Sequence, residues 1–160
     1  METKIIDIYS TGEYPANVLS NFYPNGFVFD GVACASMEGL LQSLKTKNAA
    51  LQEKVCALSG KQAKFAFRHK FQNVRWKLTG KLYWKGCPID RHSDGYQVFL
   101  DNAYLALSGN DIFAAALKST CGATLTHKIG KRDRRKTILT EYEFLSRLKM
   151  CRQLTEESSV

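Results

Sequence analysis

The stretch SDGYQVFLDNAYLALSG, residues 93–109, constrains the fold more than any other part of this sequence. Its apolar side chains recur at the i, i+3, i+4 and i+7 spacing of an α-helix with one buried face. Gly109 follows the last apolar position, as is typical of a helix C-terminus. The apolar positions of this predicted helix are Tyr96, Phe99, Leu100, Ala103, Tyr104 and Leu107. A helix with such a face requires a core around it, and the rest of the chain has to supply that core.

Local signals predict further helices. They are expected at about 37–48, 49–58, 61–70, 111–118 and 141–152. Ser36 is a candidate N-cap for the first of these helices. Two capping boxes introduce the third and the last helix, Ser59 with Gln62 and Thr140 with Glu143. Helices therefore make up most of the predicted structure.

Four stretches have the composition of strands or hairpins: residues 4–10, 26–35, 74–86 and 123–129. The second contains Asp30-Gly31, a pair suited to the tight turn of a β-hairpin. The third alternates around Thr79-Gly80 and predicts a second hairpin, and the fourth predicts a strand or an extended loop. We therefore expect a mainly α fold with a small β element, which belongs to the α+β class.

The length of 160 residues suits one domain with a sizeable core. The sequence has no internal repeat, no low-complexity tract and no linker rich in Pro, Gly or Ser. We therefore expect one compact domain over residues 1–152, followed by a flexible C-terminal tail at 153–160.

Other features predict a cytoplasmic protein. No run of about 18 apolar residues is present, so no segment is expected to span a membrane. The N-terminus, METKIIDIYS, lacks the apolar core of a signal peptide. The cysteines are odd in number and scattered, which favours reduced thiols over a disulfide framework. The histidines show no metal-ligand spacing, so we expect neither a metal site nor a cofactor.

Positive charge is concentrated in two segments of the chain. Residues 61–91 and 128–136 contain 15 of the 23 Lys and Arg residues, and the net charge of the chain is +8. A one-sided basic field attracts phosphates or nucleic acid, although a basic surface without a partner explains the charge equally well. Aromatic residues interleaved with the first segment could stack on bases, or they could belong to the core.

The predicted helix at 37–48 has three distinct sides at about 100° per residue. One side is an apolar stripe that faces the core, and the opposite side has only small residues, which suggests close approach of another element there. Between them, Glu38, Gln42 and Lys45 form a polar row at i, i+4 and i+7. This row is either ordinary surface decoration or the edge of a cleft covered on two sides.

The surrounding sequence, LSNFYPNGFVFDGVACASMEGLLQSLK, resembles the opening of the NADAR family, which is also called YbiA-like. Family members show an S-N-F stretch, an apolar segment with a D-G turn, and then S-x-E-H-x-x-Q-x-x-K. The segments LSGKQAK, YQVFLDNAYLAL and IGKRDRRKTILTEYEFLSRL are similar to later parts of the family, so the resemblance covers most of the chain. It implies a compact YbiA-like domain.

Two departures from the family pattern concern its active site. The histidine that follows the family's glutamate is Gly39 in this chain, so any role of that imidazole is absent. A tryptophan of the family's middle segment has no certain counterpart, and the nearby candidates are Trp84, Arg91 and His92.

The resemblance implies cleavage of N-glycosidic bonds on ribose. Some members of the family act on early intermediates of riboflavin biosynthesis, and others remove ADP-ribose from guanine bases. The same resemblance places Glu38, Gln42 and Lys45 on the active-site helix, and Asn21, Phe22 and Tyr23 on a loop that lines it.

Breaking a ribosyl N-glycosidic bond passes through an oxocarbenium-like state with positive charge at C1′ and O4′. Glu38 could stabilise that charge, or it could take a proton from an attacking water. Lys45 could act as an ammonium that protonates the leaving base or binds a phosphate. If burial lowered its pKa, its neutral amine could instead attack C1′ and form a Schiff base.

The remaining candidates would bind the substrate. Phe22 and Tyr23 could stack on a base and Asn21 could bond its edge or the ribose, although a structural turn explains these residues as well. Asp90-Arg91 either forms a buried pair or holds a ribose and a phosphate. His127 is either a structural residue or part of the site. Lys131 and Arg132 either bind phosphates or are solvated loop charges.

Three functions are compatible with this sequence. The first is an N-glycosidase that releases ADP-ribose from guanine, the second is an N-glycosidase of ribosylaminopyrimidine phosphates, and the third is a module that binds ADP-ribose or nucleic acid without cleavage. The expected partner is a nucleotide-like small molecule or an ADP-ribosylated nucleic acid, and no membrane is involved. The basic segments favour the first function, because a diphosphate or a DNA backbone requires several cations.

Overall fold

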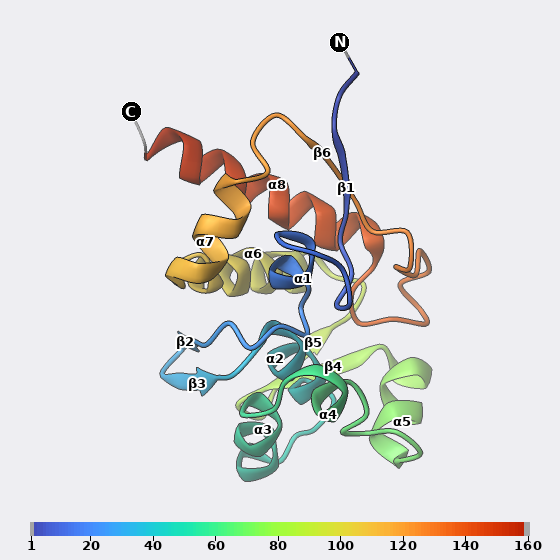
Figure 1. Cartoon of the computed structure of the whole chain (residues 1–160). Coiled ribbons are helices and arrows are strands. Elements are labelled where there is room, and N and C mark those ends of the chain that lie inside the picture. The colour runs from blue at the N-terminus through green and yellow to red at the C-terminus, as the bar shows by residue number, and fades with distance from the viewer. Residues whose placement is uncertain (1, 159–160) are drawn as a thin grey trace.

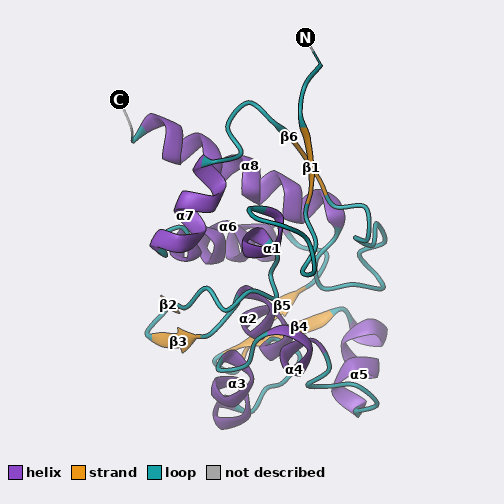
Figure 2. Cartoon of the chain, in the orientation of Figure 1, coloured by secondary structure: helices purple, strands orange, loops and turns teal. Residues whose placement is uncertain are grey.

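A computed structural model describes residues 2–158 of the chain, and it shows an α+β fold (Figures 1 and 2). The helices are α1 (Ala16–Leu19), α2 (Met37–Ser43), α3 (Ala49–Cys56), α4 (Gly60–Lys64), α5 (Phe71–Thr79), α6 (Asp94–Leu107), α7 (Asp111–Lys118) and α8 (Glu141–Glu157). The strands are β1 (Ile5–Asp7), β2 (Phe27–Phe29), β3 (Val32–Cys34), β4 (Lys81–Trp84), β5 (Cys87–Asp90) and β6 (Thr124–Thr126). The predicted class is therefore confirmed.

The strands form three two-stranded ribbons, of which β2–β3 and β4–β5 are antiparallel and β1–β6 is parallel. Figure 1 shows α2–α5 with β2–β5 in its lower half, and α1, α6, α7 and α8 with β1 and β6 in its upper half. Helix α6 contacts elements of both halves, namely α8, α2, β2 and β5.

Helix α6 confirms the prediction drawn from its apolar spacing. Ser93 is its N-cap and accepts a hydrogen bond from the backbone N–H of Tyr96. All of its predicted core residues are buried: Tyr96, Phe99, Leu100, Ala103, Tyr104 and Leu107. The burial of this complete face explains why the periodicity was so clear in the sequence.

The two predicted hairpins had different outcomes. The β2–β3 turn lies at Asp30-Gly31, where both residues have positive φ, as the sequence predicted. The predicted turn at Thr79-Gly80 is wrong, because residues up to Thr79 form α5 and Gly80 ends that helix in the left-handed conformation. The second hairpin, β4–β5, turns instead at Lys85-Gly86, where φ is again positive at both positions.

Several helix boundaries also differ from the prediction. Helix α2 ends at Ser43 rather than near 48, because the backbone N–H groups of Lys45 and Thr46 bond to carbonyls three residues back instead of four, and Asn48 then caps the next helix. Helix α4 ends at Lys64, and the Ser59 side chain forms no capping bond there. Helix α8 begins at its predicted capping box but continues to Glu157, so the part of the predicted tail up to that residue is helical. Residues 159–160 of that tail lie outside the described residues.

Among residues 2–158, no helix has both the length and the apolar character needed to cross a membrane.

Candidate active site

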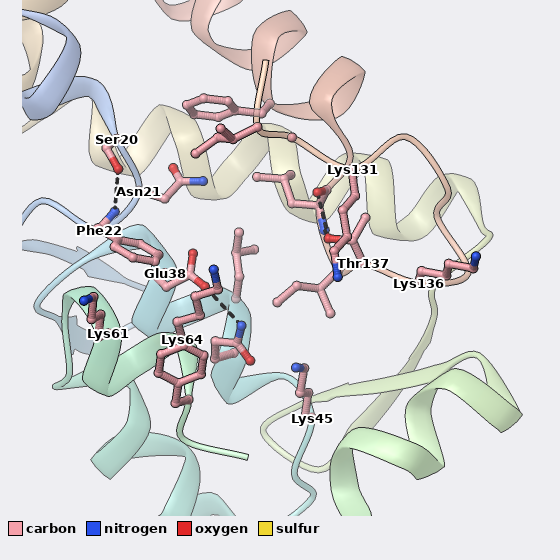
Figure 3. Close-up of a pocket in the computed structure, with 18 of the residues that line it drawn as sticks. Ser20, Asn21, Phe22, Glu38, Lys45, Lys61, Lys64, Lys131, Lys136 and Thr137 are labelled. Atoms are coloured by element: carbon pink, nitrogen blue, oxygen red, sulfur yellow. Dashed lines mark hydrogen bonds between the residues drawn. The ribbon is translucent and has the colours of Figure 1, made fainter. Parts of the chain in front are cut away.

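A pocket of about 650 Å³ opens where the two halves of the molecule meet (Figure 3). Its walls come from α2, α4 and α5 on one side, and from the loop that follows His127 on the other. The loop Ser20–Asn21–Phe22 and the Phe144 side chain of α8 complete the lining. The volume lies within the range of about 300–1,000 Å³ that is usual for small-molecule sites.

Helix α2 presents the polar row to this pocket because its other sides are occupied. The Ser36 hydroxyl accepts from the backbone N–H of Gly39 at 3.0 Å and donates to the carbonyl of Leu58 at 2.9 Å. The apolar stripe of the helix is buried in the core as predicted, at Met37, Leu40, Leu41 and Leu44. Glu38 and Gln42 are left to line the pocket.

The small-residue side of α2 is also covered. A Cβ atom at Gly39 would lie 2.5 Å from the carbonyl oxygen of Leu58 and 2.9 Å from that of Val55. The predicted close approach on this side is therefore confirmed, and α3 is the element that approaches. A histidine at position 39 would not fit against this backbone, which gives a physical reason for the departure from the family pattern.

Glu38 is partly exposed at the pocket surface, and its Oε1 accepts a hydrogen bond of 3.0 Å from Gln42 Nε2. Burial raises the pKa of the Glu38 carboxyl above its ordinary value. The bond from Gln42 and the positive charges of Lys45 and Lys64 oppose that rise. Gln42 Oε1 is buried and has no hydrogen-bond partner among the described residues.

Lys45 is only 8% exposed, although it follows the end of α2. Its Nζ donates to Asn73 Oδ1 at 2.9 Å and lies 5.9 Å from the ring centroid of Trp76. Burial lowers the pKa of the Lys45 amine from 10.5 to about 8, and the nearby charges of Lys77 and Lys131 contribute while Glu38 opposes. The neutral amine is therefore a larger minority near physiological pH than it is for an ordinary lysine.

The loop before β2 is fixed to the pocket by its backbone. The Asn21 carbonyl accepts from the backbone N–H of Glu38 at 3.1 Å, and the Phe22 carbonyl accepts from that of Gly60 at 3.1 Å. The Asn21 side chain accepts from the hydroxyl of Tyr104, which is buried on α6. Asn21 and Phe22 thus line the pocket as predicted.

A rim of exposed cations surrounds the pocket, and we call these six residues the cationic rim: Lys61, Lys64, Arg68, Lys77, Lys131 and Lys136. In Figure 3, Lys61 and Lys64 lie on one side together with Glu38, and Lys131 and Lys136 lie on the other side. The two basic segments seen in the sequence therefore meet at one site.

His127 lines the same pocket and is held firmly in place. Its Nδ1 lies 2.7 Å from the carbonyl oxygen of Ile8, and its ring packs edge-on against Phe144 at 4.8 Å between centroids. In a neutral imidazole with Nδ1 donating to that carbonyl, Nε2 is an acceptor.

Some predicted substrate contacts lie outside the pocket lining. Tyr23 packs against the core, and Trp84 packs with Phe29 and Phe99 while its Nε1 donates to Asp30. These aromatic side chains pack against the core and do not line the pocket.

Three predicted charged contacts also lie elsewhere. Asp90 is exposed and caps a turn at His92, and Arg132 forms an exposed ion pair with Glu141 at 3.1 Å. Arg91 does enter a buried pair, but its partner is Glu143 and not the neighbouring Asp90.

Much of the α5 wall was not predicted from the sequence. Asn73, Trp76 and Lys77 face the pocket at the i, i+3, i+4 spacing of a helix. Recognising α5 as a helix would have revealed this spacing. The tryptophan that lines the pocket is Trp76, which is nearer to the N-terminus than the candidates considered from the sequence.

No group of three or more His, Cys, Asp or Glu side chains that could hold a metal ion occurs within the described residues. All five cysteines are free thiols. The polar groups that line the pocket include a carboxylate, an imidazole, amides, hydroxyls and amines.

Comparison with known proteins gave three matches. The family model described as bacteriophage protein GP30.3 matches residues 13–153. The chain is 36% identical over 149 residues to an uncharacterized 17.1 kDa protein in the Gp30-rIII intergenic region of Enterobacteria phage T4, which covers 92% of this chain and 96% of that protein. The NMR structure of the E. coli protein YbiA matches with a TM-score of 0.60 and 19% identity, over 99% of this chain and 89% of that one. At this identity, the last match shows a shared fold.

Proposed function

Because the chain belongs to the family of bacteriophage protein GP30.3, a NADAR-type family, we propose that it is an N-glycosidase that hydrolyses ribosyl N-glycosidic bonds. The observation that carries this proposal is the buried Lys45 amine, which shares one pocket with the carboxylate of Glu38. These two groups are the proposed catalytic residues. The enzyme acts in the cytoplasm, where its thiols remain reduced.

The lowered pKa of Lys45 favours a covalent mechanism. Its neutral amine attacks C1′ of the ribose as the bond between C1′ and the base nitrogen breaks, and the electron pair leaves with the base, which takes a proton from solvent. The Glu38 carboxylate stabilises the positive charge that develops at C1′ and O4′. The sugar ring then opens to a Schiff base on Lys45, and water attacks with Glu38 as general base to release the ribose and restore the amine.

The leading substrate is ADP-ribose attached to guanine, in a nucleotide or in DNA. A diphosphate carries two negative charges, and the cationic rim offers partners on both sides of the catalytic pair. Phe22 supplies a ring for stacking, and Asn21, Gln42 and His127 supply polar groups for the ribose and the base. Lys131 is the proposed phosphate contact on the loop side.

The test is to incubate the purified protein with guanine-ADP-ribosylated DNA and, separately, with ribosylaminopyrimidine phosphates. We expect release of free ADP-ribose from the DNA, detected by mass spectrometry. Release from the pyrimidine phosphates alone would assign the riboflavin-type substrate instead. If both remained intact while ADP-ribose bound to the protein, the chain would be a binding module, and the glycosidase proposal would be rejected.

A further inference from the structure

Arg91 forms the most completely buried ion pair in the described part of the chain, and it lies outside the pocket lining. Its side chain is 0% exposed. Its two terminal nitrogens donate to the two carboxylate oxygens of Glu143, Nη1 at 3.0 Å and Nη2 at 2.7 Å. Burying two charges costs so much desolvation that such a pair is poor evidence for stabilisation by itself. The role of the pair therefore has to be sought in the parts of the chain that it holds in place.

The pair holds one wall of the pocket. Residues 131–139, all of which are described by the structure, form neither helix nor strand, so their path depends on tertiary bonds. Arg91 Nε donates to the carbonyl of Thr137 at 3.0 Å. Glu143 Oε1 accepts from the backbone N–H of Thr140 at 2.8 Å. Ile138 and Leu139, which lie between these two anchors, line the pocket together with Thr137.

A third anchor belongs to the same network. The hydroxyl of Tyr96 donates to the carbonyl of Ile138, and the Arg91 guanidinium lies 4.7 Å from the centroid of the Tyr96 ring. Both groups are fully buried. Successive backbone groups of the wall are thus bonded to one charged cluster.

The opposite end of Arg91 is tied to the other wall. Its backbone N–H donates to the carbonyl of Gly80 at 2.7 Å, at the C-terminus of α5. Helix α5 carries Trp76 and Asn73, and Asn73 accepts from the Lys45 amine. One residue therefore links the wall beside the amine to the wall formed by the 137–139 segment.

We propose that Arg91 and Glu143 are positioning residues that fix the distance between these two walls and so pre-shape the pocket for its ligand. They act through the 137–140 backbone and do not contact the ligand. The identity of that ligand rests on the proposed function, but the positioning role does not.

The test replaces both charges at once, with Arg91→Met and Glu143→Leu. Apolar replacement of a buried ion pair often preserves folding, because neither charge is left alone. We expect hydrogen exchange measured by mass spectrometry to accelerate in peptides that cover 131–140, while peptides from α6 keep their protection. We also expect the affinity for ADP-ribose to fall at least about tenfold, since a misplacement of ~1 Å in a site can cost on the order of 10²-fold.

Arg152→Met is the matched control. Arg152 Nη1 donates to the carbonyls of Thr120 and Ala123, so it also supports a loop, but that loop is outside the pocket lining. Exchange in 131–140 and the affinity for ADP-ribose should be unchanged in this variant. Tyr96→Phe is a milder variant that removes one anchor of the wall and leaves the charged pair in place. If the double variant does not fold, hydrogen exchange in 131–140 of Tyr96→Phe tests the proposal instead.

Unchanged exchange in 131–140 in a folded double variant, or in Tyr96→Phe when the double variant is unfolded, would overturn the proposal. Uniformly faster exchange over the whole chain would also overturn it, because that pattern indicates a role in global stability. Failure of the wild-type protein to bind ADP-ribose would count against the proposed function alone, since the exchange measurement needs no ligand.

Discussion

At the scale of single residues, the proposal depends most on the charge of Glu38. Glu38→Gln keeps the size of the side chain and removes the charge that stabilises the oxocarbenium-like state. We expect turnover to fall by about 10²–10⁴, the usual contribution of a general base. The rate of ADP-ribose release measures this effect, and a thermal melt should show an unchanged fold. Glu53→Gln makes the same change at an exposed position on α3 and should retain full activity. A Glu38→Gln enzyme working at the wild-type rate would end the catalytic assignment.

The buried Lys45 amine predicts a particular pH dependence. Burial lowers the pKa of this group to about 8, so the ammonium predominates below that pH and the neutral amine above it. If the neutral amine attacks C1′, kcat/KM rises with pH and levels off above about 8. A rate that instead falls through this range would assign Lys45 as the ammonium that protonates the leaving base. The profile of kcat/KM between pH 6 and 10 distinguishes these outcomes.

The Schiff base itself is open to trapping. Borohydride added during turnover should reduce the imine and leave a stable ribosyl adduct on Lys45, which peptide mass spectrometry would locate. Lys47 is an exposed lysine two positions away and should carry no adduct, so Lys47→Ala should trap normally. An active Lys45→Ala variant without any adduct would exclude the covalent route.

At the scale of elements, the contact between α2 and α3 decides the shape of the catalytic helix. Gly39→Ala would place a methyl group 2.5 Å from the carbonyl of Leu58, and this backbone has little freedom to move. We expect a loss of about 3 kcal/mol in the free energy of unfolding, the upper part of the range for overpacking. Urea unfolding would measure it.

Gly95→Ala provides the control for that substitution. A Cβ at Gly95 would lie 3.5 Å from Ser93 Oγ, an ordinary contact, and the position is exposed near the start of α6. Alanine is preferred over glycine in a helix, so this variant should gain up to about 1 kcal/mol. Equal stability of the two variants would mean that α2 and α3 are not in close contact.

Helix α5 shows where interpretation of elements from sequence failed. Its residues Phe71, Val74 and Leu78 are all more than half exposed, so the apolar positions do not mark the buried face. Trp76 is the residue that is buried, and Lys77 beside it faces the pocket. Without one apolar face directed to the core, this segment shows no helical period in the sequence, and the alternation around Gly80 suggests a hairpin instead.

At the scale of the whole molecule, the Arg91–Glu143 pair links the two halves and should make the fold sensitive to acid. Although burial opposes ionisation, bonds from Arg91, Gln97 and the Thr140 backbone hold the pKa of Glu143 at about 2, below its ordinary 4.5. A carboxylate with a depressed pKa stabilises the fold above its unfolded pKa, and this contribution is lost as the pH falls through the folded pKa. We expect a loss of roughly 3 kcal/mol between pH 4.5 and 2.

Comparison with Glu143→Gln isolates this contribution from that of other carboxylates. The variant should be less stable than the wild-type protein at pH 7, because Arg91 loses its counter-charge. The difference between the two proteins should shrink as the pH falls from 4.5 towards 2. Urea unfolding at a series of pH values measures it, and a constant difference would show that Glu143 does not carry the acid sensitivity.

The features that could be predicted from the sequence are those that depend on neighbouring residues along the chain. The period of α6, the Asp30-Gly31 turn and the polar row of α2 each follow from side-chain spacing or backbone preference within a few residues. Tertiary structure alone decided that Lys45 meets Asn73, 28 positions away, and that Arg91 pairs with Glu143, 52 positions away. Local periodicity says which side of an element is buried but not what lies against it, and the pocket is made almost entirely of such distant contacts.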